Sequence, residues 1–270
     1  MNPLRFIILA KIENSMIDNI LFVAAGLFAG YAVYLSADRY TRGLSLFGPL
    51  LLVCADCGGH LSKYSLVPLI GPLLARYRCS HCGARIGWPL SMVTFVSGLL
   101  SLAVVWHWAP AAERVFFLFL AWGLLLIGLL DYRHGLIPNR VLFPLFFLLV
   151  GWNLLFEVIP WEKAIPGAVV AAFLLFLVRL AGNWWLGRES MGMGDVKLAG
   201  LLGFCLGWTH FVLGLFFAAV LALAFAIVAR VLVGGPLPAA LPFGPFLAAG
   251  AGVALFFGDT LSVFYTTLWL

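Results

Sequence analysis

Long apolar segments with few or no charges recur along most of this chain, and they restrict its fold more than any other feature. A helix that crosses a bilayer needs about 20 apolar residues. Of the 270 residues, 64% are hydrophobic and only 10% are charged, whereas about a quarter of the residues of a soluble domain are charged. No water-soluble fold buries so much apolar surface, and backbone in lipid must satisfy its own hydrogen bonds. We therefore expect an all-α polytopic membrane protein.

About eight transmembrane helices account for these segments, if each crossing needs about 20 residues. The expected spans are 18–37, 88–108, 112–131, 136–158, 163–181, 195–208, 209–233 and 243–269. The first span is expected to be retained, because it carries no small-residue cleavage site followed by a soluble domain. These spans divide the chain into an N-terminal segment with the first helix (1–37), a polar domain inserted after it (38–87) and a multi-helix membrane domain (88–270).

The formal net charge of +5 is best explained by membrane topology. If the spans alternate and residues 38–87 lie in the cytoplasm, twelve of the 16 lysine and arginine residues fall on the cytoplasmic side. Only Arg5, Lys11, Arg114 and Lys163 fall on the other side, which is the bias that the positive-inside rule describes. Because the basic residues are scattered over short loops, we do not expect a nucleic-acid partner.

Four of the five cysteines form two Cys-x-x-Cys pairs in the polar domain. The pairs are Cys54 with Cys57 and Cys79 with Cys82, and 21 residues separate them. This is close to the usual spacing of a four-cysteine zinc site, and Gly58 and Gly83 follow the pairs where such turns need a positive φ. Two disulfides are the alternative, which a reducing cytoplasm disfavours. With four thiolates the zinc ion would be structural, since no ligand position is left open.

Two aspartates stand out in a chain with only eleven acidic residues. Asp131 ends the apolar run 115–130, and Asp195 follows Gly192 and Gly194. Each aspartate alone is explained as a residue at a helix end, since a carboxylate can cap the free N–H groups of a helix start. The pair is harder to explain in this way, because acidic groups at membrane depth are costly and tend to be functional. Two spans lie between them, so an even number of crossings brings both to one side of the membrane.

Two carboxylates at one site can divide the roles of acid and base on an attacking water, because they do not both ionise easily. This chemistry favours an aspartic peptidase, with Asp131 and Asp195 as its catalytic pair. Gly192 and Gly194 leave room for the backbone of a substrate strand, since neither has a side chain. Lys197 is expected to pair either with Asp195 or with lipid headgroups.

The same residues resemble the motifs of the bacterial prepilin peptidases, the aspartic leader peptidases of type IV pili and type II secretion. Residues 192–197, Gly-Met-Gly-Asp-Val-Lys, resemble the GxGD motif of that family. Asp131 with residues 134–139 resembles its first-aspartate segment, and residues 242–248 resemble the entry of its last span. Together with the cysteine pairs, these motifs cover most of residues 50–250, and the set is far more specific than any one motif.

The resemblance implies an endopeptidase in the bacterial inner (cytoplasmic) membrane that cuts the short basic leader from a prepilin or pseudopilin on the cytoplasmic side. By motif position, Asp131 and Asp195 would be catalytic and the two cysteine pairs would bind zinc. Many family members also methylate the new N-terminus with S-adenosylmethionine. In the family the second cysteine pair is usually followed by Pro-Leu-x-Glu, whereas this chain has Pro-Leu-Ser-Met at residues 89–92. The resemblance therefore supports the peptidase more strongly than the methyltransferase.

Three other functions fit part of the pattern. A presenilin-like intramembrane aspartyl protease shares the glycine–aspartate motif, but the cysteine pairs and residues 242–248 favour the prepilin peptidases. A proton- or cation-coupled transporter predicts charges near the midplane of the bilayer, whereas both aspartates here are expected near one boundary. A zinc-binding membrane adaptor without chemistry leaves the paired aspartates unexplained.

Overall fold

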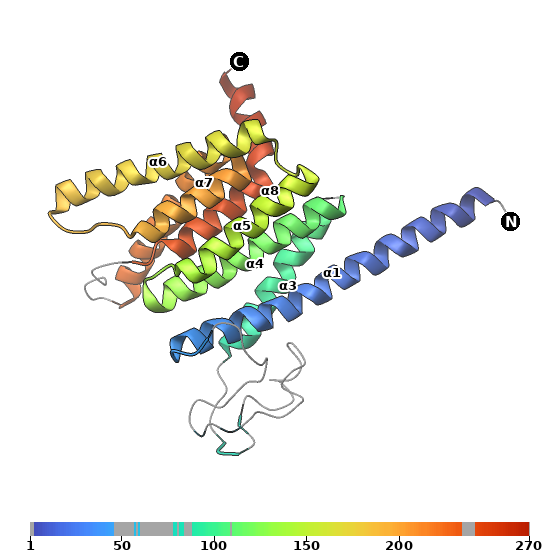
Figure 1. Ribbon diagram of the computed structural model, residues 1–270, viewed down its shortest axis with the longest axis horizontal. Coiled ribbons are helices and arrows are strands. Elements are labelled where there is room, and N and C mark those ends of the chain that lie inside the picture. Colours follow the sequence, from blue (N-terminus) through green and yellow to red (C-terminus); the bar gives the residue numbers. More distant parts are fainter. Residues whose placement is uncertain are drawn as a thin grey trace. The chain divides into compact units, whose positions relative to one another are not determined.

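Long α-helices make up most of the chain that the structure describes (Figure 1). The computed structural model describes residues 3–45, 57, 59, 78–79, 81–83, 88–108, 110–233 and 241–269. The helices of these residues are α1 (Pro3–Thr41), α3 (Pro89–His107), α4 (Ala111–His134), α5 (Asn139–Phe156), α6 (Trp161–Leu186), α7 (Met193–Val233) and α8 (Gly244–Trp269). Seven spans in them are long and apolar enough to cross a membrane. The predicted all-helical, multi-pass architecture is therefore confirmed.

The chain divides into two compact units, Met1–Trp122 and Gly123–Leu270, with the division inside α4. In the first unit α1 packs against α3. The Ser97 hydroxyl donates to the Gly26 carbonyl oxygen at 2.6 Å across this contact. The helix α1 continues to Thr41, so the predicted boundary at residue 38 falls inside it. The extra turn is stabilised by an ion pair between Asp38 and Arg42, four residues apart, at 2.8 Å.

In the second unit α7 packs against both α6 and α8 (Figure 1). Glycines allow both contacts. A Cβ added at Gly203 would collide with the Gly167 carbonyl oxygen of α6, and one added at Gly250 would collide with the Gly214 carbonyl oxygen of α7. Such close approach of backbones is typical of helix packing in membranes, where apolar side chains gain little from contacting each other instead of lipid.

The helix α7 is broken at Gly207, whose φ of 73° and ψ of 166° are not helical. The break divides it close to the predicted boundary between the spans 195–208 and 209–233. At 1.5 Å per residue, the first part, residues 193–206, is about 21 Å long and too short to cross about 30 Å of hydrocarbon. Its residues 195–205 are almost all buried, so this short helix lies inside the bundle and carries Asp195 on its first turn.

Candidate active site

Asp131 lies in the last turn of α4, and the residues after it end the helix. The Gly135 N–H donates to the Asp131 carbonyl oxygen at 2.7 Å, and Gly135 has a φ of 63°. A residue in this left-handed conformation terminates a helix, and glycine adopts it without steric cost. Pro138 then precedes the first residue of α5, Asn139. The sequence therefore fixes the position of Asp131 at the end of its helix.

The Asp131 carboxylate also holds the start of α8. The N–H of Gly244, the first residue of that helix, donates to Asp131 Oδ2 at 2.8 Å in a buried hydrogen bond. A Cβ added at Gly244 would lie 2.7 Å from the same oxygen, closer than real Cβ atoms approach a neighbour. Gly244 belongs to the string 242–248 that resembles the family's last-span entry, and its close contact with Asp131 explains why a glycine stands there.

Asp195 lies at the opposite end of its own helix, in the first turn of α7. The backbone N–H of Gly192 is directed at its carboxylate, whose Oδ2 lies 3.7 Å from the position that a Cβ of Gly192 would take, and Asp131 acts on the carboxylate electrostatically. Its Oδ1 is buried and has no hydrogen-bond partner among the described residues. The free N–H groups at a helix start favour a negative charge, so α7 supports a carboxylate at this position.

The two carboxylates are the only buried ones in the part of the chain that the structure describes. Asp131 is 5% exposed and Asp195 is 9% exposed. Buried carboxylates are expensive in a membrane, and a structural role needs only one well-bonded group. A pair of interacting carboxylates, with an unsatisfied oxygen on one of them, is instead an arrangement that can bind and activate a water molecule or a peptide carbonyl.

The supporting residues predicted from the sequence connect the two aspartate segments. A Cβ at Gly194 would lie 2.8 Å from Ile137 Cβ, so Ile137 occupies the space that the missing side chain leaves. The Lys197 ammonium donates to Asn139 Oδ1 at 3.0 Å and lies 5.6 Å from the ring centre of Phe143, so its observed partner is not Asp195, one of the two that the sequence suggested. Both contacts hold the start of α7 against the segment that follows Asp131.

Three of the four predicted zinc ligands lie together in the first unit. The sulfurs of Cys57, Cys79 and Cys82 are all within 4.8 Å of one another, and those of Cys57 and Cys79 are 3.8 Å apart. A tetrahedral zinc ion with bonds of about 2.3 Å places its sulfurs about 3.8 Å apart, so this set fits a thiolate-bound zinc. Gly83 has the predicted positive φ, 71°. Cys54 and Gly58 lie outside the described residues.

Two contacts at the aspartates were not predicted from the sequence. One is the bond from Gly244 to Asp131, which joins residues 113 positions apart. The other is the interaction of Arg179, at the end of α6, with the loop before Asp195. The glycine inside the string 242–248 was a signal for the first, and an arginine within an apolar helix was a signal for the second.

The fold and the site together define a membrane protein with a buried aspartate pair at one end of a helix bundle. Residues 118–227, which include both aspartates, match the model of the type IV leader peptidase family. Residues 24–108 match that of the bacterial peptidase A24 N-terminal domain. No solved structure is a significant match.

Curated relatives agree with these matches. The chain is 32% identical to a prepilin leader peptidase/N-methyltransferase of Pseudomonas putida, over 77% of this chain and 72% of the relative. It is 30% identical to a protein of the same name from Stutzerimonas stutzeri, over 98% and 95%. With a third such relative, from Pseudomonas aeruginosa, the identity is 31% over 78% and 73%. The chain therefore belongs to the type IV leader peptidase family and is a multi-pass membrane peptidase.

Proposed function

We propose that Asp131 and Asp195 are the catalytic pair of this peptidase, and that it removes the short basic leader of type IV prepilins or pseudopilins at the cytoplasmic face of the inner membrane. The observation that carries the proposal is the electrostatic contact between two buried carboxylates at the ends of α4 and α7. Both lie within the residues that match the family model.

The pair carries out hydrolysis by moving protons between water and substrate. One carboxylate takes a proton from the attacking water as the water oxygen bonds to the scissile carbonyl carbon, and the protonated partner gives its proton to the carbonyl oxygen. The C–N bond then breaks as the new amine takes up a proton from the pair. The N–H groups of Gly192 and Gly244 act on one oxygen of each carboxylate, which leaves the other oxygen of each for the water and the scissile carbonyl.

The names of the relatives support the proposed substrate, and the charge of the flanking segments supports the proposed membrane side. The relatives are named for prepilin leaders. Arg133, Arg140, Arg188 and Lys197 all lie in the segments that flank the two aspartates. Basic residues next to membrane spans favour the cytoplasmic side, so the pair faces the compartment in which a newly made prepilin keeps its leader.

The expected cofactor is one structural zinc ion, bound by Cys54 together with Cys57, Cys79 and Cys82. A bound zinc would hold the polar domain folded and would take no part in peptide cleavage, since four thiolates complete its coordination. Cys54→Ser should lower the zinc content of the purified protein below one ion per chain. An unchanged content would remove Cys54 from the site.

The relatives' names also contain an N-methyltransferase activity. This second function would need S-adenosylmethionine, and the chain has Met92 where many family members have a glutamate. The test is to cleave a prepilin in the presence of S-adenosylmethionine and to measure the mass of the N-terminal peptide of the product. An added methyl group would establish the second activity, and its absence would restrict the protein to cleavage.

The peptidase proposal is tested by reconstitution in lipid with a type IV prepilin. Wild-type protein should release the leader, and Asp131→Asn and Asp195→Asn should each lower the cleavage rate by about 10²- to 10⁴-fold, the usual contribution of a general acid or base. If either variant cleaves at the wild-type rate, the two aspartates are not a catalytic pair.

A further inference from the structure

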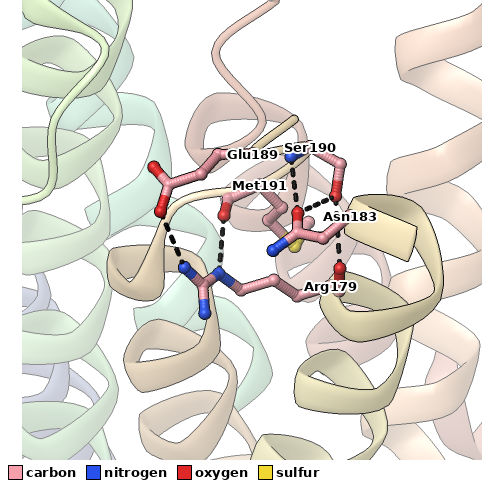
Figure 2. Close-up of polar contacts among 5 residues, drawn as sticks. All are labelled: Arg179, Asn183, Glu189, Ser190 and Met191. Carbon is pink, nitrogen blue, oxygen red and sulfur yellow. Dashed lines mark hydrogen bonds and ion pairs between the residues drawn. The ribbon is translucent and has the colours of Figure 1, made fainter. Parts of the chain in front are cut away.

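The loop between α6 and α7 is fixed to α6 by side chains at its last two turns (Figure 2). Arg179 Nε donates to the Met191 carbonyl oxygen at 2.9 Å, and its NH2 group donates to Glu189 at 3.2 Å. Four residues along the helix, Asn183 Oδ1 accepts from the Ser190 N–H at 2.7 Å. Three consecutive loop residues are thus bound from one face of α6, immediately before the residue that donates to Asp195.

The loop is close to the helix because Gly182 has no side chain. A Cβ at Gly182 would collide with the Ser190 hydroxyl. That hydroxyl lies 3.0 Å from Asn183 Oδ1 and 3.4 Å from the Arg179 carbonyl oxygen. The residues Arg179, Gly182 and Asn183 therefore form one docking face, which binds residues 189–191 of the loop.

The bond to Met191 has a consequence for Asp195. The Met191 carbonyl and the Gly192 N–H belong to the same peptide group, and no cis peptide bond is present in the described residues. In a trans peptide the C=O and the N–H point in opposite directions. Arg179 binds the oxygen on one side of this group, and the N–H on the other side is directed at the Asp195 carboxylate. That carboxylate lies next to Gly192, since its Oδ2 is 3.7 Å from the position of a Gly192 Cβ. The bond from Arg179 to the Met191 carbonyl oxygen therefore also keeps the Gly192 N–H directed at Asp195.

An arginine near the end of a membrane helix has a simpler alternative. Its long side chain usually extends to the lipid headgroups, where the guanidinium stays hydrated. The Arg179 side chain does not do so, since it is only 17% exposed and both of its bonds go to the loop. The Glu189 carboxylate is 84% exposed, so its ion pair contributes little, and the bond to the Met191 carbonyl is the one that explains the inward position.

We propose that Arg179 is a positioning residue for peptide cleavage: it holds the Met191–Gly192 peptide group so that the Gly192 N–H stays directed at Asp195. The inference rests on the proposed role of Asp195. It assigns to Arg179 no contact with the substrate. Loss of the guanidinium should therefore slow the chemical step and leave substrate binding unchanged.

The test is steady-state cleavage of a prepilin by the full-length protein in lipid, with kcat and KM measured separately. For Arg179→Ala we expect kcat to fall by about 10- to 150-fold, because one charge-assisted hydrogen bond is lost, while KM changes less than twofold. Arg179→Lys should recover part of kcat, since an ammonium can still donate to the Met191 carbonyl oxygen. Glu189→Gln is the matched control and should keep the wild-type kcat, because it removes only the exposed ion pair.

Hydrogen exchange of residues 187–194 provides a readout that does not depend on activity. The amides of this segment should exchange faster in Arg179→Ala than in wild type, and Arg179→Lys should lie between the two. Arg179→Lys also serves if Arg179→Ala does not fold.

The results separate the two proposals. Cleavage by wild type together with its loss in Asp195→Asn supports the peptidase function. In that same assay, an unchanged kcat in Arg179→Ala, or a rise in KM without a fall in kcat, overturns the role of Arg179 alone. Equal loss of activity in Arg179→Ala and Arg179→Lys, with unchanged hydrogen exchange, overturns it as well.

Discussion

Substitution of Gly244 by alanine tests how closely α8 must approach the first aspartate. The added Cβ would lie 2.7 Å from Asp131 Oδ2 and 3.1 Å from its Cγ, whereas ordinary contact begins at 3.4 Å. The carboxylate oxygen therefore has to move by about 0.7 Å, the difference between 3.4 and 2.7 Å. The hydrogen bond from the Gly244 N–H, now 2.8 Å, would lengthen to about 3.5 Å, beyond the usual range.

The size of the effect follows from the bond that is lost. A hydrogen bond to a charged group contributes about 1.5–3 kcal/mol. At 1.36 kcal/mol for each factor of ten, its loss corresponds to a cleavage rate lower by about 10- to 150-fold. A displacement of this size at a catalytic group is enough to produce such a loss by itself, since misplacement by about 1 Å can cost about 100-fold.

The assay is prepilin cleavage in lipid, with Gly252→Ala as the matched control. Gly252 lies in the same helix, and a Cβ added there meets nothing within 4 Å. We expect the control to cleave at the wild-type rate and to unfold at the wild-type temperature or higher, because alanine favours a helix over glycine. Gly244→Ala should fold but unfold at a lower temperature, because it loses a buried hydrogen bond. A Gly244→Ala protein that is folded and cleaves within threefold of wild type would refute the reasoning.

Three further variants probe the contacts around the pair. Gly194→Ala would place a Cβ 2.8 Å from that of Ile137 and should lower the cleavage rate by about tenfold. Its control is Gly151→Ala, whose Cβ meets nothing within 4 Å; equal cleavage rates of the two variants would contradict the packing argument. Lys197→Met keeps the apolar stem of the side chain and loses the 3.0 Å bond to Asn139, so the cleavage rate should fall a few-fold at an unchanged KM. A wild-type rate would show that this bond is dispensable. Asp259→Asn should not change the cleavage rate, since this side chain is 93% exposed and lies about 22 Å along α8 from the first residue of that helix. A strong loss of cleavage would mean that the assignment of the two membrane sides is wrong.

The helices could largely be predicted from the sequence because the bilayer imposes one length scale on every span. The boundary expected between the spans 195–208 and 209–233 lies close to Gly207, where α7 is broken. The ends of α1 were predicted less well. Its polar residues beyond position 37 still form helix because Asp38 and Arg42 pair along it, and polarity alone does not reveal such a local pair.

The approach of the two aspartates to each other could also be predicted, because counting the spans between them places both at the same end of the helices. The contacts that hold the carboxylates could not. The bond from Gly244 to Asp131 depends on how α8 packs beside α7, which is fixed by the approach of Gly214 and Gly250. Sequence spacing contains no information on a contact between residues that far apart. The role of Arg179 likewise depends on which way one peptide group faces.

The described site binds its carboxylates with backbone groups rather than with polar side chains. A membrane interior offers no water to a buried carboxylate, so each one needs a fixed donor. Asp131 receives the N–H of Gly244, and Asp195 receives that of Gly192. A backbone donor next to a carboxylate requires space, and glycine provides it at Gly244, where a Cβ would displace the oxygen. The glycines next to the aspartates are therefore as necessary to this arrangement as the carboxylates themselves. Asp195 Oδ1 alone has no partner among the described residues, and it is the oxygen that the proposed catalytic role would use.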